Sequence, residues 1–149
     1  MSTNIRAART DDFDAVTELL ELLGRERVTA ATRDECRAIF EAQVLDPSTH
    51  HMVAADGTGV VGFCSLHFRE RLNFGAAQAW IPDLVVADRS RRDGVGRALL
   101  EEAERRARGH GCYELVLETG YQRAEAHHLY RQFRMRDQGK FFRKELRAA

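Results

Sequence analysis

Hydrophobic positions along the first third of the chain follow helical and strand spacings in turn, which predicts mixed α/β structure. A short strand is expected at Ile5–Ala8. It precedes a helix that starts at Asp11, carries apolar residues every three or four positions and ends at Gly24. Thr32-Arg33-Asp34-Glu35 has the capping-box pattern, which predicts a second helix that runs to about Leu45.

The middle of the chain has the short apolar runs of a β-sheet. His51–Ala55 and Gly59–Leu66 flank a turn at Asp56-Gly57, so they are expected to pair as a hairpin. A long central strand is predicted from about Ala77 to Ala87. Because proline has no N–H for a ladder, pairing in this strand is expected to break or bulge at Pro82.

The last third alternates helix and strand. Asp93 or Gly94 is expected to start a third helix, and Cys112–Glu118 follows as a strand. A fourth helix is predicted over Arg123–Arg134, and then two final strands, the last at Phe141–Leu146. The fold class is therefore α/β, with about four helices around a mixed sheet of six or seven strands.

Composition predicts a soluble globular protein. The length of 149 residues favours one domain over residues 1–149, with ordinary hydrophobic (44%) and charged (31%) contents. No apolar run approaches the ~20 residues of a membrane span, and no signal peptide is seen, so no membrane contact is expected. Cys36, Cys64 and Cys112 lack metal-ligand spacing. We expect free thiols in a reducing cytoplasm, and no metal.

Charge is unevenly spread although the net charge is zero. Residues 1–88 hold 8 basic and 14 acidic side chains, a balance of −6, and residues 89–149 hold 15 basic and 9 acidic, a balance of +6. An acidic half favours a cationic acceptor such as an amine, although scattered solvated charge would give the same balance. The basic residues do not predict nucleic-acid binding.

A basic glycine loop between the central strand and the third helix is the strongest functional motif. It consists of Arg91, Arg92, Asp93, Gly94, Val95, Gly96 and Arg97. A helix N-terminus has unpaired N–H groups and a partial positive charge, and glycines let phosphate oxygens approach the backbone. Arg97-Ala98 excludes a nucleotide P-loop, and Leu99 stands where a dinucleotide fingerprint needs a third glycine. A plain surface turn explains neither the preceding strand nor Arg91.

With these residues the chain resembles the GCN5-related N-acetyltransferase (GNAT) superfamily. The acetyl-CoA loop of that superfamily reads Gln/Arg-x-x-Gly-x-Gly/Ala, which Arg91–Gly96 matches, and the likeness runs from Arg6 to Leu146. The resemblance implies the GNAT fold, with a splay between the fourth and fifth strands that receives the pantetheine arm. It implies acetyl-CoA as co-substrate, and backbone contacts to it from Leu84, Val85 and Val86. An N–H near Leu84 would face the thioester oxygen, a donor whose loss typically costs ~3 kcal/mol.

Two positions depart from the family pattern. Arg123 stands where many relatives have an asparagine that contacts the cofactor, so phosphate pairing and a solvent-exposed role are both open. Arg134-Met135 replaces the usual Gly-Phe after the fourth helix. Either arginine adopts the left-handed conformation of that cap, at a cost of roughly 1 kcal/mol, or the helix ends differently here.

Tyr130 matches the family tyrosine that serves the leaving thiolate. Proton transfer from tyrosine (pKa ~10) to a thiolate (~8.5) is uphill by roughly 2 kcal/mol, so Tyr130 either hydrogen-bonds the thiolate or has a lowered pKa. An ordinary tyrosine of an amphipathic helix is the structural alternative.

The proton acceptor is open among three residues. An amine with a pKa of ~10.4 must lose a proton before it attacks. Asp83 lies on the central strand, where relatives often place an acidic base, and Glu118 and His67 are alternatives. Asp83 could equally orient the acceptor or accept a structural hydrogen bond.

These features predict an acetyl-CoA-dependent N-acetyltransferase that acetylates a primary amine directly, in a ternary complex. His50-His51 and Leu66-His67-Phe68 are similar to small-amine acetylators of the aminoalkylphosphonate type, so a small-molecule acceptor is expected. The alternatives are a protein or peptide N-acetyltransferase, a non-catalytic acetyl-CoA-binding regulator and a generic nucleotide-binding module. Many relatives dimerise, and a homodimer is left open.

Overall fold

The computed structural model describes residues 2–118 and 124–147. The chain divides into two compact units, residues 1–117 and 118–149. The described residues of the first unit form three α-helices and seven strands. The helices are α1 (Phe13–Leu22), α2 (Arg33–Leu45) and α3 (Val95–Gly109). The strands are β1 (Asn4–Ala7), β2 (Met52–Asp56), β3 (Gly59–Cys64), β4 (His67–Arg71), β5 (Ala76–Ile81), β6 (Leu84–Val86) and β7 (Glu114–Leu117).

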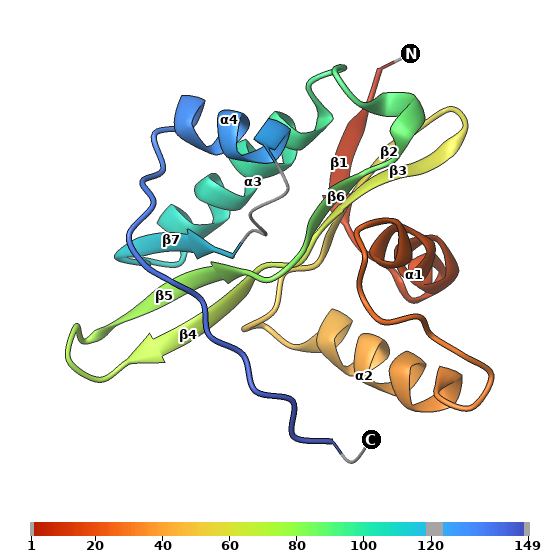
Figure 1. Ribbon diagram of the computed structural model, residues 1–149, viewed down its shortest axis with the longest axis horizontal. Helices are drawn as coiled ribbons and strands as arrows, with labels where there is room; N and C mark the ends of the chain where they lie inside the picture. The colour runs from red at the N-terminus through yellow and green to blue at the C-terminus, as the bar shows by residue number, and fades with distance from the viewer. Residues whose placement is uncertain (1, 119–123, 148–149) are drawn as a thin grey trace. The chain divides into compact units, whose positions relative to one another are not determined.

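Four strands form an antiparallel sheet in the order β1-β2-β3-β6. Helix α1 contacts β3 and β6, and α3 contacts β2, β3 and β6 from the opposite face (Figure 1). Side chains of successive strand residues point to opposite faces, so Val53 and Phe63 face α1 while Ala54 and Gly62 face α3. The sheet is therefore buried between two helical layers.

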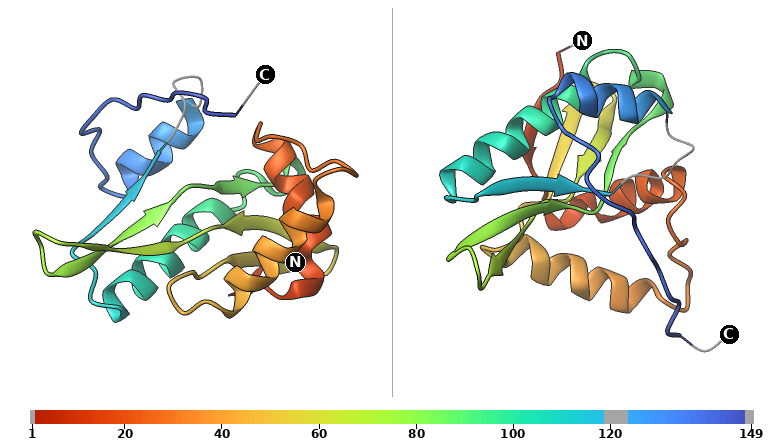
Figure 2. Two further views of the ribbon diagram at one scale, coloured as in Figure 1. Left: turned by 90° about the horizontal axis from the view of Figure 1, so that it is seen from below. Right: turned by 60° about the vertical axis from the view of Figure 1, so that its left-hand side comes forward.

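The other three strands form a mixed sheet in the order β4-β5-β7. Strands β4 and β5 are antiparallel, with His67 opposite Trp80, and they project as a hairpin beyond α1 and α2 (Figure 2). Strands β5 and β7 are parallel, from Gln78 opposite Glu114 to Ile81 opposite Leu117. The predicted α/β fold class with a mixed sheet is confirmed.

The predicted central strand breaks at Pro82, as its missing N–H suggested. Strand β5 ends at Ile81 and pairs with β7, whereas β6 starts at Leu84 and pairs with β3 at the end of the other sheet. Within the described residues β6 therefore has one open edge. In the predicted strand order, β5 and β6 together are the fourth strand and β7 is the fifth. After Ile81, β6 pairs with β3 and no longer continues beside β7, which is the splay expected between these two strands.

Helix α3 lies unusually close to the four-stranded sheet at Gly62. A Cβ added at Gly62 would lie 3.1 Å from Leu99 Cδ1, 3.1 Å from Val95 Cγ1 and 3.3 Å from the Cβ of Ala54. Because Gly62 is paired with Val86 of β6, this contact sets the first two turns of α3 directly over the β3–β6 pair.

Glycine ends helix α1 as predicted. Gly24 has a φ of +93°, and its N–H donates to the carbonyl of Glu21 at 3.0 Å. The N–H of Arg25 reaches back to the carbonyl of Leu20, also at 3.0 Å, which completes a Schellman motif. This motif turns the chain sharply at Arg25.

In the second unit the described residues form α4 (Ala124–Gln132). Its cap is left-handed at Arg134, whose φ is +66°, and the N–H of Met135 donates to the carbonyl of Tyr130 at 2.9 Å. Of the two possibilities that the sequence left open for this helix end, the structure shows the left-handed arginine cap. Among the residues described, no helix has both the length and the apolar character needed to cross a bilayer.

One strand prediction differs at its end and another is wrong. The strand predicted over residues 59–66 is β3, which ends at Cys64, and β4 starts anew at His67. The two final strands are absent, since no residue from 135 to 147 is in a strand. The apolar residues there, Phe141, Phe142 and Leu146, are 64%, 87% and 87% exposed. A strand needs a partner for its backbone groups, and this segment pairs with none in the part of the chain that the structure describes.

Replacing Gly62 by alanine is expected to destabilise the fold by about 1 to 3 kcal/mol, because the added methyl group meets three buried side chains at once. Urea unfolding of Gly62→Ala against wild type measures the change. Gly109→Ala is a matched control, since a Cβ at Gly109 has no neighbour within 4 Å. An unchanged unfolding midpoint in Gly62→Ala would show that the helix moves away without cost.

Candidate active site

The glycine loop leads directly into the N-terminus of α3. Gly94 is the N-cap residue, with a left-handed φ of +79°, and a Cβ placed there would meet no atom within 4 Å. The first N–H groups of a helix have no partner inside the helix and carry partial positive charge. The Val95 side chain is buried against Gly62, so this helix end is held firmly on the sheet. The arrangement suits an anionic group.

The three arginines around this helix end are all exposed. Arg91 Nε lies 3.2 Å from Asp88 Oδ1, and Arg97 Nε lies 3.1 Å from Glu101 Oε1. Exposed pairs of this kind contribute at most about 1 kcal/mol, so an anionic ligand can compete with both carboxylates. Arg92 has a φ of +72°, a left-handed conformation that the sequence did not predict.

The open edge of β6 presents backbone hydrogen-bonding groups. The N–H of Ser65 donates to the carbonyl of Asp83 at 2.9 Å, and the N–H of Ala87 donates to the carbonyl of Val61 at 2.8 Å. Alternate residues of an antiparallel strand point their backbone groups to opposite sides. Val85 therefore directs its groups toward β3, while Leu84 and Val86 direct theirs to the open edge. Of the three residues expected to bind the pantetheine arm, these two are placed to do so.

Asp83, in the break between β5 and β6, is held by side chains from two distant segments. Its Oδ1 accepts a hydrogen bond from Arg25 Nε at 2.7 Å, and Arg25 also donates to the carbonyl of Pro82 at 2.9 Å. Ser65 Oγ lies 3.4 Å from Asp83 Oδ2 and accepts from the Asp83 N–H at 3.1 Å. Oδ1 thus accepts a short hydrogen bond from Arg25, and Oδ2 is bound only weakly.

Three aromatic rings form a cluster next to this break. His67 contacts Trp80 with ring centroids 5.3 Å apart, and it contacts His51 edge-on at 5.6 Å. His51 Nε2 lies 2.6 Å from Gln43 Oε1 of α2. The other ring nitrogen of His51 and the indole nitrogen of Trp80 are buried without a hydrogen-bond partner within the described residues.

Burial controls protonation in this cluster. It lowers the pKa of His51 to about 4. Desolvation also lowers the pKa of His67, against the opposing charge of Asp83. Both imidazoles are therefore neutral at pH 7. Burial raises the pKa of the Cys64 thiol, which makes that cysteine unsuited to act as a nucleophile.

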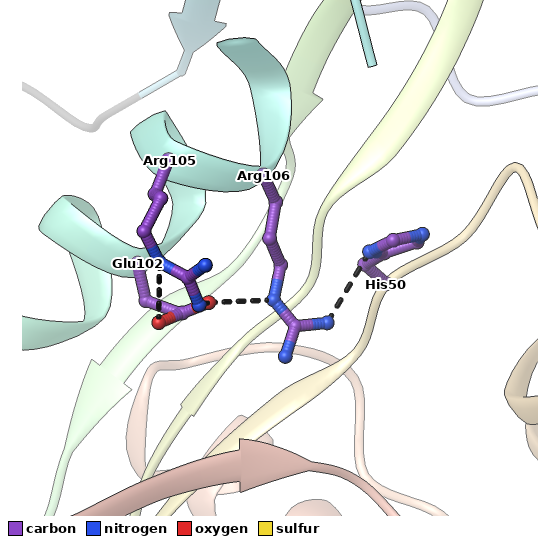
Figure 3. Close-up of polar contacts among 4 residues, drawn as sticks. All are labelled: His50, Glu102, Arg105 and Arg106. Atoms are coloured by element: carbon purple, nitrogen blue, oxygen red, sulfur yellow. Dashed lines mark hydrogen bonds and ion pairs between the residues drawn. The ribbon is translucent and has the colours of Figure 1, made fainter. Parts of the chain in front are cut away.

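A third histidine joins α3 to the segment before β2 (Figure 3). Arg106 donates to Glu102 Oε2 at 2.9 Å and lies 3.2 Å from His50 Nδ1, and Glu102 also binds Arg105. A guanidinium only donates, so His50 Nδ1 must be the acceptor and hence unprotonated. Desolvation, followed by the charge of Arg106, lowers the pKa of His50.

The remaining predicted site residues lie elsewhere in the chain. Glu118 follows β7 and is exposed. Tyr130 is half-buried on α4, in the second unit. Arg123 lies outside the described residues. No group of three His, Cys, Asp or Glu side chains in the described ranges could hold a metal ion.

Three neighbours of the site were not found from the sequence: Arg25, Ser65 and Trp80. His51 was noted only through the likeness of His50-His51 to small-amine acetylators. Arg25 is 58 positions from Asp83, and no local pattern connects the two. The strand pattern did contain a signal for Trp80, since it lies two residues before Pro82 on the expected central strand. Its pairing with His67 depends on the hairpin register, which the sequence left open.

Comparisons with known proteins place the chain among acetyltransferases. A family model described as Acetyltransferase (GNAT) family matches residues 14–134. The aminoalkylphosphonate N-acetyltransferase of Salmonella typhimurium is 37% identical over 127 residues, which cover 85% of this chain and 80% of that protein.

Solved structures show the same fold at lower identity. A protein described as a transcriptional regulator from Bacillus halodurans C-125 has a TM-score of 0.89 at 23% identity, covering 97% of this chain and 100% of that one. Glucosamine-6-phosphate N-acetyltransferase from Arabidopsis thaliana has a TM-score of 0.81 at 21% identity, covering 99% and 100%. At such identities the likeness concerns the fold alone.

Acid is expected to destabilise the protein through its buried histidines. The folded state holds the His51 proton less tightly (pKa about 4) than the unfolded state does (6.5). The stabilisation is therefore complete above pH 6.5 and is lost as the pH falls toward 4. Between pH 7.5 and 5.0, His51 alone should account for a loss of about 2 kcal/mol, and the lowered pKa values of His50 and His67 act in the same direction.

Urea unfolding of wild type and His51→Phe at both pH values measures this contribution, which should disappear in the variant. His128→Gln, at an exposed position of α4, is the control and should keep the full pH dependence. Equal pH dependence in wild type and His51→Phe would contradict the assignment.

Proposed function

Because the chain belongs to the acetyltransferase (GNAT) family, we propose that it transfers an acetyl group directly from acetyl-CoA to the primary amine of a small molecule. Family membership and the named relative make the chain an N-acetyltransferase. The donor, the acceptor and the roles of individual residues are the substance of the proposal. One observation carries it, namely a left-handed glycine at the N-terminus of α3, a helix that contacts the strand whose edge is open.

The donor-binding residues are the loop and the open edge of β6. The N-terminus of α3 and the side chains of Arg91, Arg92 and Arg97 hold the pyrophosphate, because they combine unpaired N–H groups with exposed positive charge. The backbones of Leu84 and Val86 bind the amides of the pantetheine arm. Arg123 adds a further contact to the cofactor in this proposal.

The reaction needs a donor for the negative charge that develops on the thioester oxygen. The Leu84 N–H fills this role in the proposal, since it is the first such group after the break and points to the open edge. Donors of this kind typically contribute ~3 kcal/mol to the transition state.

The acceptor in this proposal is a small amine. Asp83 carries negative charge at the break and retains one weakly bound oxygen, Oδ2, which suits the binding of an ammonium group. The acidic balance of residues 1–88 favours the approach of a cation. The relative's name suggests aminoalkylphosphonates as the acceptors to test first.

Tyr130 assists the leaving thiolate in this proposal. Tyr130→Phe should lower kcat by tenfold or more while the affinity for acetyl-CoA stays the same, because the hydroxyl is needed only as the C–S bond breaks. Thiol release measured at saturating acetyl-CoA, with a parallel binding titration, separates the two quantities. Unchanged kcat in Tyr130→Phe would remove Tyr130 from the mechanism.

Calorimetric titration tests the donor site. Acetyl-CoA should bind with micromolar affinity, and ATP and NAD should bind far more weakly. Gly96→Glu should abolish binding, since it adds bulk and negative charge where phosphate oxygens approach the backbone. Gly109→Ala, at the far end of α3, is the control and should bind normally. Absence of acetyl-CoA binding in folded wild-type protein would refute the donor assignment.

A further inference from the structure

We propose that His67, rather than Asp83, removes the proton from the acceptor ammonium group. This inference rests on the proposed function and assigns the residue that makes the acceptor nucleophilic. It would settle the choice that the sequence left open among Asp83, Glu118 and His67.

The surroundings of Asp83 favour a binding role over proton transfer. Its Oδ1 is 2.7 Å from Arg25 Nε, and the same guanidinium is tied to the carbonyl of Pro82. Ser65 bridges the Asp83 backbone N–H and Oδ2. Arg25 and Ser65 therefore fix the orientation of the carboxylate, and Oδ2 is the oxygen left for a ligand.

His67 has the opposite arrangement. It is the first residue of β4 and lies opposite Trp80, two positions before the Pro82 break. Its ring is half-buried between His51 and Trp80, and neither ring nitrogen forms a hydrogen bond to any residue in the described part of the chain. Both nitrogens are thus available to a ligand.

Two buried polar atoms on the rings that contact His67 have no hydrogen-bond partner within the described residues. His51 is 7% exposed, and its Nε2 faces a carbonyl oxygen of Gln43, so Nε2 carries the hydrogen and Nδ1 keeps a lone pair. Trp80 Nε1 is a donor only. One acceptor and one donor, both without partners in the described residues, suit an amine or a water that gives and receives hydrogen bonds.

Burial and the negative charges that face His67 act on its pKa in opposite directions. Asp83, in the break, and Asp46, after α2, raise its pKa, while Arg69 on the same strand lowers it. His51, neutral at pH 7, is the other titratable ring in contact. Desolvation outweighs these charges, so the net direction is down and the imidazole is free to accept a proton at pH 7.

The proton balance of the step is complete. The ammonium group R–NH3+ gives one proton to a ring nitrogen of His67, and the freed lone pair forms the C–N bond to the acetyl carbon. The C–S bond breaks and its electron pair leaves on sulfur. The second ammonium proton passes to the sulfur, which gives the thiol. His67 then returns its proton to solvent, so each turnover yields one amide, one thiol and one H+.

The pH dependence of kcat/KM tests the assignment, with acetyl-CoA and 2-aminoethylphosphonate from pH 5 to 10. In wild type, kcat/KM should fall tenfold per pH unit below an apparent pKa under 6.5, and reach a plateau above it. His67→Gln should lose about 100-fold at pH 7. Without a base the variant depends on the small fraction of free amine, so its rate should keep rising toward the pKa of the amine. At pH 10 the kcat/KM of His67→Gln should be less than tenfold below that of wild type.

Asp83→Asn distinguishes the two candidates independently of how His67→Gln folds. It should keep the acid limb and move it to lower pH, because the charge that favours protonated His67 is gone. Two results would overturn the assignment of His67 but leave the proposed function intact. One is loss of the fall in kcat/KM at low pH in Asp83→Asn. The other is the same fall at low pH in a folded His67→Gln that binds acetyl-CoA. His110→Gln, at an exposed ring beyond α3, should leave the profile unchanged. Wild-type protein that acetylates no amine would overturn the proposed function itself.

Discussion

The break between β5 and β6 is the constraint on which the proposed site depends. Proline cannot donate to a ladder, so the central strand cannot pair continuously past Pro82. On one side of the break, β5 is committed to β4 and β7, and on the other side β6 is committed to β3. The edge of β6 is left open as a result, and Asp83 is brought to the point where the two sheets part. The proposed donor site and the proposed acceptor site both lie at this break.

Close packing determines how the rest of the donor site is held. The absence of a side chain at Gly62 lets Val95 and Leu99 reach the sheet, and this contact fixes the start of α3 relative to β6. A helix terminus can stabilise an anion only within its first turn, since the effect falls off quickly along the axis. The position of a buried glycine on β3 therefore matters to a binding loop about thirty residues later in the chain.

The sequence predicted the elements whose signals are local. Nearby residues predicted the span of α2, the hairpin of β2 and β3, the break at Pro82 and the Gly24 cap. The absent final strands show the limit of such signals, because strand propensity cannot supply a pairing partner. The surroundings of the acceptor were equally out of reach. The pair of Arg25 with Asp83 and the cluster of His51, His67 and Trp80 join distant segments, and they exist only once the sheets have formed.

The buried histidines connect the proposed chemistry to the range of conditions in which the protein survives. The desolvation that keeps His67 ready to accept a proton also makes every proton that the cluster takes up in acid a cost to the folded state. A variant with these rings opened to water would tolerate acid better, but its imidazoles would begin to charge nearer to neutrality. If His67 is the base that we propose, acid tolerance and readiness for catalysis are opposed in this protein, and selection for growth in acid would act on the same rings as selection for turnover.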